Sequence, residues 1–322
     1  THVLTISKNA LPAISDDGMS AVSSSIKVTR ALGLDTTRHL SIAGKYPSFL
    51  ARPDRYQTWI APATFVGRRI LRAMRDPVLF STFPVASAHS VGLRLKRALG
   101  IPWIADFRDP MHVAGETIPA LAEIESAAVH HADAISVTTA ATRDLFVERY
   151  PRAKLIEKSI VIENGYNESV AKIAESERRQ TSIDPHAKTL TLLHSGSVYG
   201  ESRNPAALVR ALAEARDESL IKAGDIQILF RGGTQRPHIA ALIESHDLGA
   251  FVQFLPKISH SEALDEMCRS HGFLLLQGEN FNAQIPAKVY EYLALRRPIL
   301  ALTDSSGATG RLLHPWLPSR LH

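Results

Sequence analysis

Short apolar runs alternate with amphipathic segments along the second half of the chain. The apolar runs lie at 189–196, 226–230, 251–255, 273–277 and 298–302. Helical periodicity covers 204–215, about 236–246, 261–270 and 286–296. Continuously apolar strands separated by helices are typical of a parallel sheet with both faces covered. The pattern therefore predicts a doubly wound α/β domain.

The first half repeats this alternation less regularly. Its strand candidates are 2–6, 77–82, 102–106, 134–138 and 159–164, and its helix candidates are about 63–75, 87–98, 120–131 and 140–149. Segment 7–60 is rich in Ser, Asp and Pro, and its pattern assigns no element to it. We expect a second doubly wound domain here.

A polar stretch separates the two halves and is interpreted as a linker over 167–188. The predicted domains are then 1–166 and 189–322. Two such domains are expected to face a cleft at the carboxyl ends of their strands, where ligands of doubly wound sheets bind. Candidate chemistry therefore belongs in the loops that follow strands.

Composition is consistent with two soluble domains. The chain has 322 residues, with 45% apolar and 21% charged residues, and it contains no apolar run of the length that spans a bilayer. A single cysteine, Cys268, excludes an internal disulfide and favours a reducing compartment. Residues 1–165 hold 20 Lys and Arg against 15 Asp and Glu, so they carry the whole net charge of +5. This half is expected to face an anionic partner.

Two loops of the second domain suit an anion. Gly196 follows the first strand of this domain, and Arg203 stands just before the Asn204-Pro205 helix start. Arg231 ends the next strand and is followed by two glycines. Guanidinium groups beside a helix N-terminus can bind phosphate. A glycine turn with an exposed arginine is the structural alternative at both loops.

The stretch "AQIPAKVYEYL" carries a third candidate. Pro286 suits the first position of a helix, and Lys288 falls in the first turn, where the helix dipole disfavours a cation. An anionic ligand explains such a lysine better than helix stability does. Glu291 lies on the same face and can accept two hydrogen bonds from a ribose diol. The alternative is an intrahelical Lys288–Glu291 pair, which contributes only about 0.2–0.5 kcal/mol.

Candidate groups in the first domain follow its apolar strand "PWIAD". Asp106, Arg108 and Asp109 place two carboxylates around one guanidinium. Such a group suits hydroxyl binding or general-base catalysis. A structural ion pair that fixes the turn explains the same residues equally well.

The predicted helix 63–75 carries Arg68, Arg69, Arg72 and Arg75 beside an apolar stripe. Basic amphipathic helices of this type lie on anionic lipid. A solvated face above a core stripe is the alternative.

Metal and nucleic-acid sites are not expected. His130 and His131 are adjacent and point about 100° apart on a helix, and no histidine spacing typical of a zinc site occurs. The basic residues are scattered and belong to no recognised nucleic-acid-binding module.

Several motifs together resemble one family, the group 1 glycosyltransferases of GT-B fold. They are "GSVYGESRNPAALVRAL", "ILFRGG", "LGAFVQFLPKISHSEAL" and "IPAKVYEYLALRRPIL" in the second half, with "IPWIADFRDP" and "VIENGYN" in the first. The resemblance implies transfer of a sugar from a nucleotide diphosphate sugar, with retention and without a metal or other cofactor. The implied acceptor is a glycan or a lipid-linked sugar of cell-envelope polysaccharide synthesis. The implied location is the cytoplasm, with contact to the inner face of the plasma membrane through 63–75.

The resemblance also implies roles for individual residues. Glu291 matches the glutamate that holds the donor ribose, and Lys288 matches the diphosphate-facing helix start. The remaining donor-side matches are Gly196, Arg203, Arg231, Ala283, Gln284 and Ile285. Asp106, Arg108 and Asp109 match acceptor-side polar groups and are the candidate catalytic residues.

The sequence departs from the family pattern in three respects. Many relatives carry a second glutamate where this chain has Ala283, so Glu279 is the candidate substitute. The first strand and glycine-rich turn of the N-terminal domain are expected to be missing, and the closing C-terminal helices as well. A nucleotide-sugar 2-epimerase of the same fold is one alternative. A non-catalytic sugar-nucleotide-binding or scaffold protein is the other, and it is motivated by Ala283 and the parts expected to be missing.

Overall fold

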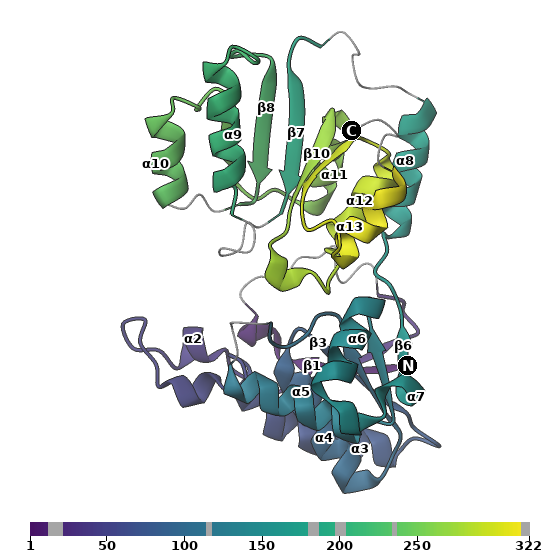
Figure 1. Ribbon diagram of the computed structural model, residues 1–322. Coiled ribbons are helices and arrows are strands. Elements are labelled where there is room, and N and C mark those ends of the chain that lie inside the picture. Colours follow the sequence, from purple (N-terminus) through teal and green to yellow (C-terminus); the bar gives the residue numbers. More distant parts are fainter. Residues whose placement is uncertain (12–21, 114–117, 180–186, 197–203, 234–236, 317–322) are drawn as a thin grey trace. The chain divides into compact units, whose positions relative to one another are not determined.

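The computed structural model describes residues 1–11, 22–113, 118–179, 187–196, 204–233 and 237–316. The chain forms two compact units, residues 1–162 and 163–322 (Figure 1). Each unit is built around parallel strands joined by helices. This is the predicted α/β class in both halves.

The second unit contains a parallel sheet in the order β11-β10-β7-β8-β9. Its strands are β7 (Leu190–Ser195), β8 (Ile226–Arg231), β9 (Val252–Leu255), β10 (Gly272–Leu276) and β11 (Ile299–Leu302). Its helices are α8 (Glu168–Arg179), α9 (Ala206–Asp217), α10 (Pro237–Ser245), α11 (His260–Arg269), α12 (Lys288–Leu295) and α13 (Ala308–Leu313), with short 3₁₀ turns η6 (Glu279–Phe281) and η7 (His314–Trp316).

Alternate residues of the interior strand β10 pack against opposite helix layers. Leu274 and Leu276 join the cluster formed with α9 and α10. Phe273 joins the cluster formed with α8, α11 and α12. All five residues of β10 are buried, because a strand covered on both faces must be apolar throughout. This explains why the run FLLLQ shows no alternation.

The sequence was interpreted as a linker over 167–188, but the structure shows a helix over 168–179. This segment forms α8, which contacts α11 and α12. Val170 is fully buried in the same cluster as Phe273 and Tyr292. The segment is polar in composition because one narrow stripe is enough to anchor a surface helix. The two units meet in sequence at Ile162 and Glu163.

The first unit contains two separate groups of parallel strands. The strands β1 (His2–Ile6) and β2 (Lys27–Ala31) pair with each other, and β3 (Leu79–Phe83), β4 (Trp103–Phe107), β5 (Ala134–Val137) and β6 (Ser159–Val161) form a sheet in that order. The helices are α2 (Thr36–His39), α3 (Ile60–Arg72), α4 (Ala86–Leu99), α5 (Pro119–His131), α6 (Ala140–Arg149) and α7 (Leu155–Lys158), with 3₁₀ turns η1 (Lys8–Ala10), η2 (Ser48–Ala51), η3 (Gln57–Trp59) and η4 (Pro151–Ala153).

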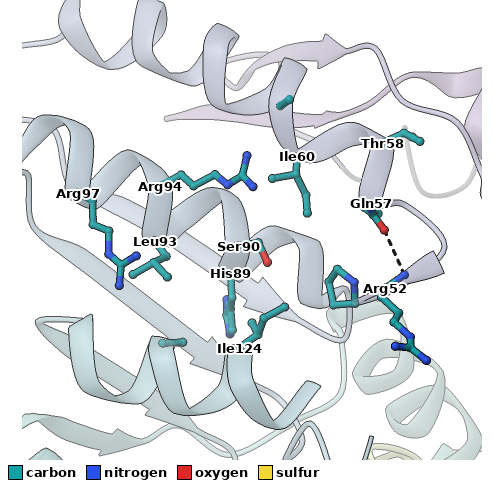
Figure 2. A pocket seen from close by; sticks show the side chains of 13 residues that line it. Arg52, Gln57, Thr58, Ile60, His89, Ser90, Leu93, Arg94, Arg97 and Ile124 are labelled. Atoms are coloured by element: carbon teal, nitrogen blue, oxygen red, sulfur yellow. Dashed lines mark hydrogen bonds between the residues drawn. The ribbon is translucent and has the colours of Figure 1, made fainter. Parts of the chain in front are cut away.

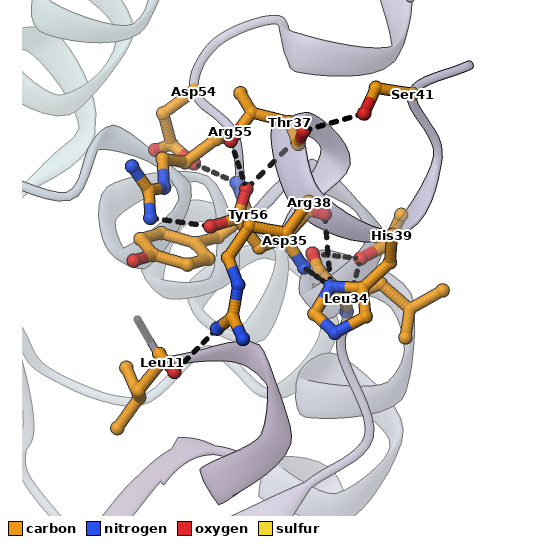
Figure 3. Close-up of polar contacts among 11 residues, drawn as sticks. Leu11, Leu34, Asp35, Thr37, Arg38, His39, Ser41, Asp54, Arg55 and Tyr56 are labelled. Carbon is orange, nitrogen blue, oxygen red and sulfur yellow. Dashed lines mark hydrogen bonds and ion pairs between the residues drawn. The ribbon is translucent and has the colours of Figure 1, made fainter. Parts of the chain in front are cut away.

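Segment 7–60, to which the sequence assigned no element, contains β2 and α2 and is organised around a buried carboxylate (Figure 3). Asp35 caps α2 by accepting hydrogen bonds from Thr37 N–H at 2.9 Å and Thr37 Oγ1 at 2.7 Å. Arg55 forms an ion pair with the same carboxylate. Asp54 in turn accepts from the backbone N–H of Ser87 at 2.6 Å, at the start of α4. These contacts tie an irregular segment to the start of α4.

A second buried carboxylate fixes the loop after β4. Glu125 on α5 is fully buried and accepts hydrogen bonds from Met111 N–H at 2.6 Å and Tyr150 Oη at 2.8 Å. Arg149 donates to the same carboxylate at 2.5 Å. A buried charge is tolerated when it is paired and its lone pairs are satisfied. Glu125 therefore joins α5, α6 and the loop that follows the candidate residues at β4.

We expect Glu125→Ala to destabilise the first unit by about 3–5 kcal/mol. The substitution leaves the partly buried Arg149 guanidinium without its counter-charge. Chemical denaturation followed by circular dichroism measures this change. Glu123→Ala is the matched control on the same helix, since Glu123 is exposed, and it should leave the midpoint within experimental error. An unchanged midpoint for Glu125→Ala would contradict the role given to this network.

Candidate functional site

The strand order of the second unit defines where a ligand should bind. After β7 the chain adds β8 and β9 on one side, and it then crosses to add β10 and β11 on the other. The switch point of the sheet therefore lies between β7 and β10. Doubly wound sheets bind ligands outside the carboxyl ends of the strands at this point. The residues there are Ser195 at the end of β7, Gly196 directly after it, and Gln277 after β10.

Lys288 lies at this switch point, over the end of β7. Its Nζ is 3.2 Å from Nε2 of the buried His194. Nδ1 of His194 lies 3.0 Å from the carbonyl oxygen of Leu274 on β10. A carbonyl only accepts, so Nδ1 carries the proton and Nε2 accepts from the lysine ammonium. A neutral imidazole thus holds the cation in place.

Gly196 makes room for this ammonium group. It has φ +117, and a Cβ built on it would lie 3.1 Å from Lys288 Nζ. A side chain here would strain the backbone and displace the lysine. The absence of a side chain therefore keeps the lysine ammonium accessible at the end of β7.

Tyr292 fixes α12 against the same strand. It is fully buried, stacks on Phe273 with ring centroids 4.2 Å apart, and accepts a hydrogen bond from Ser195 N–H at 3.0 Å. Because Lys288 and Tyr292 are one turn apart on one helix, this contact sets where the lysine can reach.

Glu291 is the most distinctive titratable group of the site. Its carboxyl is partly buried, and burial raises its pKa, while the charges of His260 and Lys288 act in the opposite direction. Among the described residues no hydrogen bond or ion pair reaches this carboxylate, so the intrahelical pair with Lys288 is not formed. A desolvated carboxylate without a partner can accept hydrogen bonds from a ligand.

The loop before α12 is held by side-chain contacts to its carbonyls. Gln277 Nε2 donates to the carbonyl oxygens of Phe281 at 2.7 Å and Gln284 at 3.0 Å. Thr309 Oγ1 also donates to Gln284 O at 3.0 Å. Ala283 and Ile285 lie in this loop, partly buried and 8% exposed, respectively. The regular helix begins at Lys288, two residues after the predicted start at Pro286, and Glu279 is exposed.

Of the two candidate donor-side arginines, the structure describes only Arg231. Arg231 donates to both carboxylate oxygens of Glu266 at 2.8 and 2.6 Å and to Pro256 O at 3.0 Å. Its guanidinium joins β8 to α11, and the hydrogen bonds that it donates to Glu266 raise its pKa. Arg203 and Gly200 lie outside the described residues.

Asp106 lies inside β4 rather than beyond it. Its carboxylate accepts hydrogen bonds from Thr82 Oγ1 at 2.7 Å and Ser136 Oγ at 2.6 Å, one from each neighbouring strand. Its register places it directly between these residues. Arg108 is exposed and Asp109 is partly buried just after the strand. Asp106 therefore places a carboxylate at one end of the sheet, and each of its two oxygens accepts a hydrogen bond from a hydroxyl group.

A basic pocket of about 510 Å³ lies in the first unit beside α4 (Figure 2). Arg52, Arg94 and Arg97 line it, above an apolar floor that includes Leu93 and Ile124. No carboxylate is among its lining residues. Helices α3 and α4 together carry six Lys and Arg and no acidic residue, and Phe65 on α3 is 65% exposed.

Three site residues were missed by the sequence analysis: His194, Gln277 and Tyr292. Each is a polar side chain buried in or beside an apolar strand. His194 could have been noticed as the one titratable residue in the run TLTLLHSG. Gln277 similarly ends FLLLQ. Nothing in the sequence marks Tyr292 as a site residue, because its apolar ring suits the core stripe of α12.

No helix in the described part of the chain is long and apolar enough to cross a membrane. Within the same residues, no group of three or more His, Cys, Asp or Glu is arranged to hold a metal ion. Independence from metal stays a prediction.

Comparisons with known proteins identify the architecture. No family model matches the sequence, and no curated protein matches it by sequence. Among solved structures, sucrose-phosphate synthase from Thermosynechococcus elongatus is similar with 16% identity and a TM-score of 0.59, over 93% of this chain and 70% of that one.

Two further structures support the same conclusion. HepE of Anabaena in complex with UDP-glucose has 11% identity and a TM-score of 0.59, over 98% of this chain and 88% of that one. The UDP-forming trehalose-phosphate synthase from Burkholderia xenovorans, in complex with glucose-6-phosphate, has 11% identity and a TM-score of 0.62, over 97% and 80%. At these identities the likeness establishes the fold, two doubly wound Rossmann-like units of the GT-B architecture.

Proposed function

We propose that the protein is a glycosyltransferase that moves a sugar from a nucleotide diphosphate sugar to a glycan or lipid-linked acceptor. The observation that carries this proposal is the arrangement at the switch point of the second unit. There Lys288 is held by a neutral imidazole beside Gly196, and Glu291 offers a partly buried carboxylate one turn further along α12. The lysine ammonium suits the diphosphate of such a donor, and the carboxylate suits its ribose.

The lysine and the helix start supply the electrostatic part of the reaction. Negative charge develops on the diphosphate as the bond to the sugar breaks, and a fixed ammonium stabilises it without reorganisation. The amides of the first turn of α12 add their partial positive charge. With these groups in place, we propose transfer without a metal, and with retention as in the family that the sequence resembles.

Glu291 is proposed to bind the ribose hydroxyls. A carboxylate can accept two hydrogen bonds from a vicinal diol, which makes it selective for a ribonucleotide. UDP-glucose bound to HepE and the UDP-forming reaction in the name of the trehalose-phosphate synthase are consistent with such a donor. The remaining donor-side residues proposed are Gly196, Arg203, Arg231, Ala283, Gln284 and Ile285.

The acceptor is proposed to bind near Asp106, Arg108 and Asp109 in the first unit. Asp106 is held by two hydroxyl groups, and ligand hydroxyls can replace or extend such contacts. The basic α3–α4 face, together with the exposed Phe65, supports peripheral contact with an anionic membrane and hence a place at the inner face of the plasma membrane.

Glu291→Gln should weaken binding of UDP-glucose by about 10- to 100-fold, because the variant loses charge-assisted hydrogen bonds to the ribose. Isothermal titration against a panel of nucleoside diphosphates and their sugars measures this loss. Wild-type affinity should fall on acidification, at a higher pH than for an ordinary glutamate, because burial raises the pKa of Glu291. The Gln variant should lack this dependence.

The matched control is Glu244→Gln, an exposed glutamate on α10. The same preparations are then incubated with the donor that binds, with and without a mixture of membrane lipids and oligosaccharides, and products are identified by mass spectrometry. Sugar transfer that requires an acceptor supports the proposal. Product from donor alone indicates epimerisation, and binding without turnover indicates a non-catalytic protein. Equal donor affinity in the Glu291 variant and the wild type would remove the basis of the assignment.

Gly196→Ala should lower affinity for the same donor by about tenfold, because the methyl group displaces the Lys288 ammonium and strains the backbone. Gly224→Ala separates the two causes, since Gly224 has φ +96 but no atom within 4 Å of its Cβ position. The control should lose stability without losing affinity. If both variants bind alike, Gly196 does not serve to expose the lysine.

Arg69→Glu combined with Arg72→Glu should reduce binding to vesicles containing anionic phosphatidylglycerol by more than about tenfold, because each basic residue contributes on the order of 1 kcal/mol at such a surface. Cosedimentation measures binding, and vesicles of neutral phosphatidylcholine set the baseline. Arg210→Glu combined with Arg269→Glu in the second unit is the charge-matched control. Equal loss in both pairs would show a general charge effect and no specific membrane face.

A further inference from the structure

The basic pocket beside α4 is built from helices and not from the ends of strands (Figure 2). Its lining residues on α4 run from the first turn to the last: His89, Ser90, Leu93, Arg94 and Arg97. Segment 52–61 forms a second wall, and α5 contributes a third. None of its described lining residues belongs to β3, β4, β5 or β6, or to the loops that directly follow these strands. Its ligand is therefore not placed where substrates of a doubly wound unit bind.

Three guanidinium groups of the pocket have no carboxylate partner. Among the described residues, no ion pair reaches Arg52, Arg94 or Arg97, which all line the pocket. Acidic residues adjoin the lining in the sequence, but they are engaged elsewhere. Asp54 accepts from Ser87 N–H at 2.6 Å, and Glu125 accepts from Met111 N–H at 2.6 Å. Glu123 lines a different pocket on α5. The positive charge of the cluster is thus not neutralised by this part of the chain.

A histidine next to the pocket is affected by this charge. Nη2 of Arg97 lies 3.1 Å from Nε2 of His131 at the end of α5. Burial lowers the pKa of His131, and the charges of Arg97, His130 and Lys158 lower it further. Nε2 of the neutral ring accepts from the guanidinium, which only donates. His131 therefore orients Arg97 without adding a negative charge.

Gln57 adds an uncharged donor to the wall opposite α4. Its Oε1 accepts a hydrogen bond from Arg52 N–H at 3.3 Å (Figure 2). This contact assigns the oxygen, since an amide NH₂ in its place would oppose another donor. The NH₂ group makes no hydrogen bond among the described residues. Donors are thus available on both walls of the pocket.

His89 is the fully buried polar residue of the lining. Burial lowers its pKa to about 3, against an opposing effect of the Asp106 backbone, so the imidazole is neutral. Its Nδ1 lies 2.8 Å from Ser81 Oγ, which accepts from Trp103 Nε1–H at 2.9 Å. Ser81 makes no other hydrogen bond among the described residues, so its O–H donates to Nδ1 and the ring proton lies on Nε2. Nε2 has no hydrogen-bond partner in the described structure.

We propose that this pocket binds the phosphate monoester of a small organic molecule. A phosphate monoester carries a charge of about −1.5 to −2 at pH 7, and guanidinium groups match its oxygens in geometry. A carboxylate or a phosphodiester carries a single negative charge and leaves most of the cluster uncompensated. The inference does not depend on the proposed sugar transfer, since no strand end contributes to the pocket.

The size and the apolar part of the pocket indicate that the phosphate is attached to a larger body. The volume of about 510 Å³ lies in the range of small-molecule pockets, roughly 300–1,000 Å³, and exceeds what one phosphate group needs. Leu93 and Ile124 give the lining an apolar surface beside the cations. A molecule of about the size of a sugar can contact both parts.

Isothermal titration of the full chain with glucose 6-phosphate tests this inference. We expect glucose 6-phosphate to bind, inorganic phosphate to bind at least about tenfold more weakly, and glucose to give no detectable heat. Arg94→Gln combined with Arg97→Gln should weaken binding of glucose 6-phosphate by at least about tenfold, because the ester loses charge-assisted hydrogen bonds. Inorganic phosphate that binds as tightly as the ester would overturn the inference.

The charge-matched control is Arg152→Gln combined with Lys154→Gln, two exposed residues of the same unit outside the pocket. It should retain the wild-type affinity, and equal loss in both double variants would overturn the inference. Lys288→Gln distinguishes this pocket from the donor site, since it should leave binding of glucose 6-phosphate unchanged. Loss in that variant alone would place the ester at the donor site and contradict the proposal.

Backbone NMR of the wild-type chain gives an answer that depends on no variant. Titration with glucose 6-phosphate should shift the amide signals of 89–97 and 124–128, and changes confined to 288–292 would overturn the inference. Vesicles of phosphatidylglycerol test a lipid phosphodiester as the occupant. If the Arg94 and Arg97 substitutions reduce vesicle binding while the wild type binds no glucose 6-phosphate, the pocket recognises a lipid headgroup and the inference is wrong.

Discussion

The donor-side geometry depends on one hydrogen-bonded chain across the switch point of the second unit. The carbonyl of Leu274 accepts from Nδ1 of His194, and Nε2 of His194 accepts from Lys288. The first contact is between neighbouring strands, and the second joins a strand to α12. Because the carbonyl can only accept and the lysine ammonium can only donate, the direction of both hydrogen bonds is fixed. This hydrogen-bonded chain places a cation at the carboxyl end of β7.

The two units use buried polar groups for different purposes. In the first unit, Thr37 and Arg55 hold the Asp35 carboxylate, and Met111, Arg149 and Tyr150 hold the Glu125 carboxylate. These contacts fix irregular segments against the helices. In the second unit, Glu291 is partly buried without any such partner among the described residues. Burial raises its pKa, so ionisation is harder in the folded chain than in an unfolded one, and the cost disappears in acid. A group that weakens the fold at neutral pH is explained by a ligand more readily than by stability.

The sequence by itself determined the fold class. Strand runs such as FLLLQ and helices such as 140–149 are read directly from periodicity, because burial on one or both faces dictates which positions are apolar. It also placed Lys288 and Glu291 on one face of α12, since helix spacing is fixed. It failed at β2, which lies in a polar segment, and at α8, whose buried stripe is too narrow to stand out from its charged residues.

Only the tertiary structure decided which side chains meet. Arg231 and Lys288 both follow the pattern of an anion site, but Arg231 is paired with Glu266 from another helix, whereas Lys288 is held by the imidazole of His194. The pairing of β1 with β2, and of β3 with β4, is likewise not readable from the apolar runs. Periodicity reports how deeply each residue is buried, and it carries no information on pairing between elements distant in the chain. Those pairings depend on strand order and register, which only the folded chain shows.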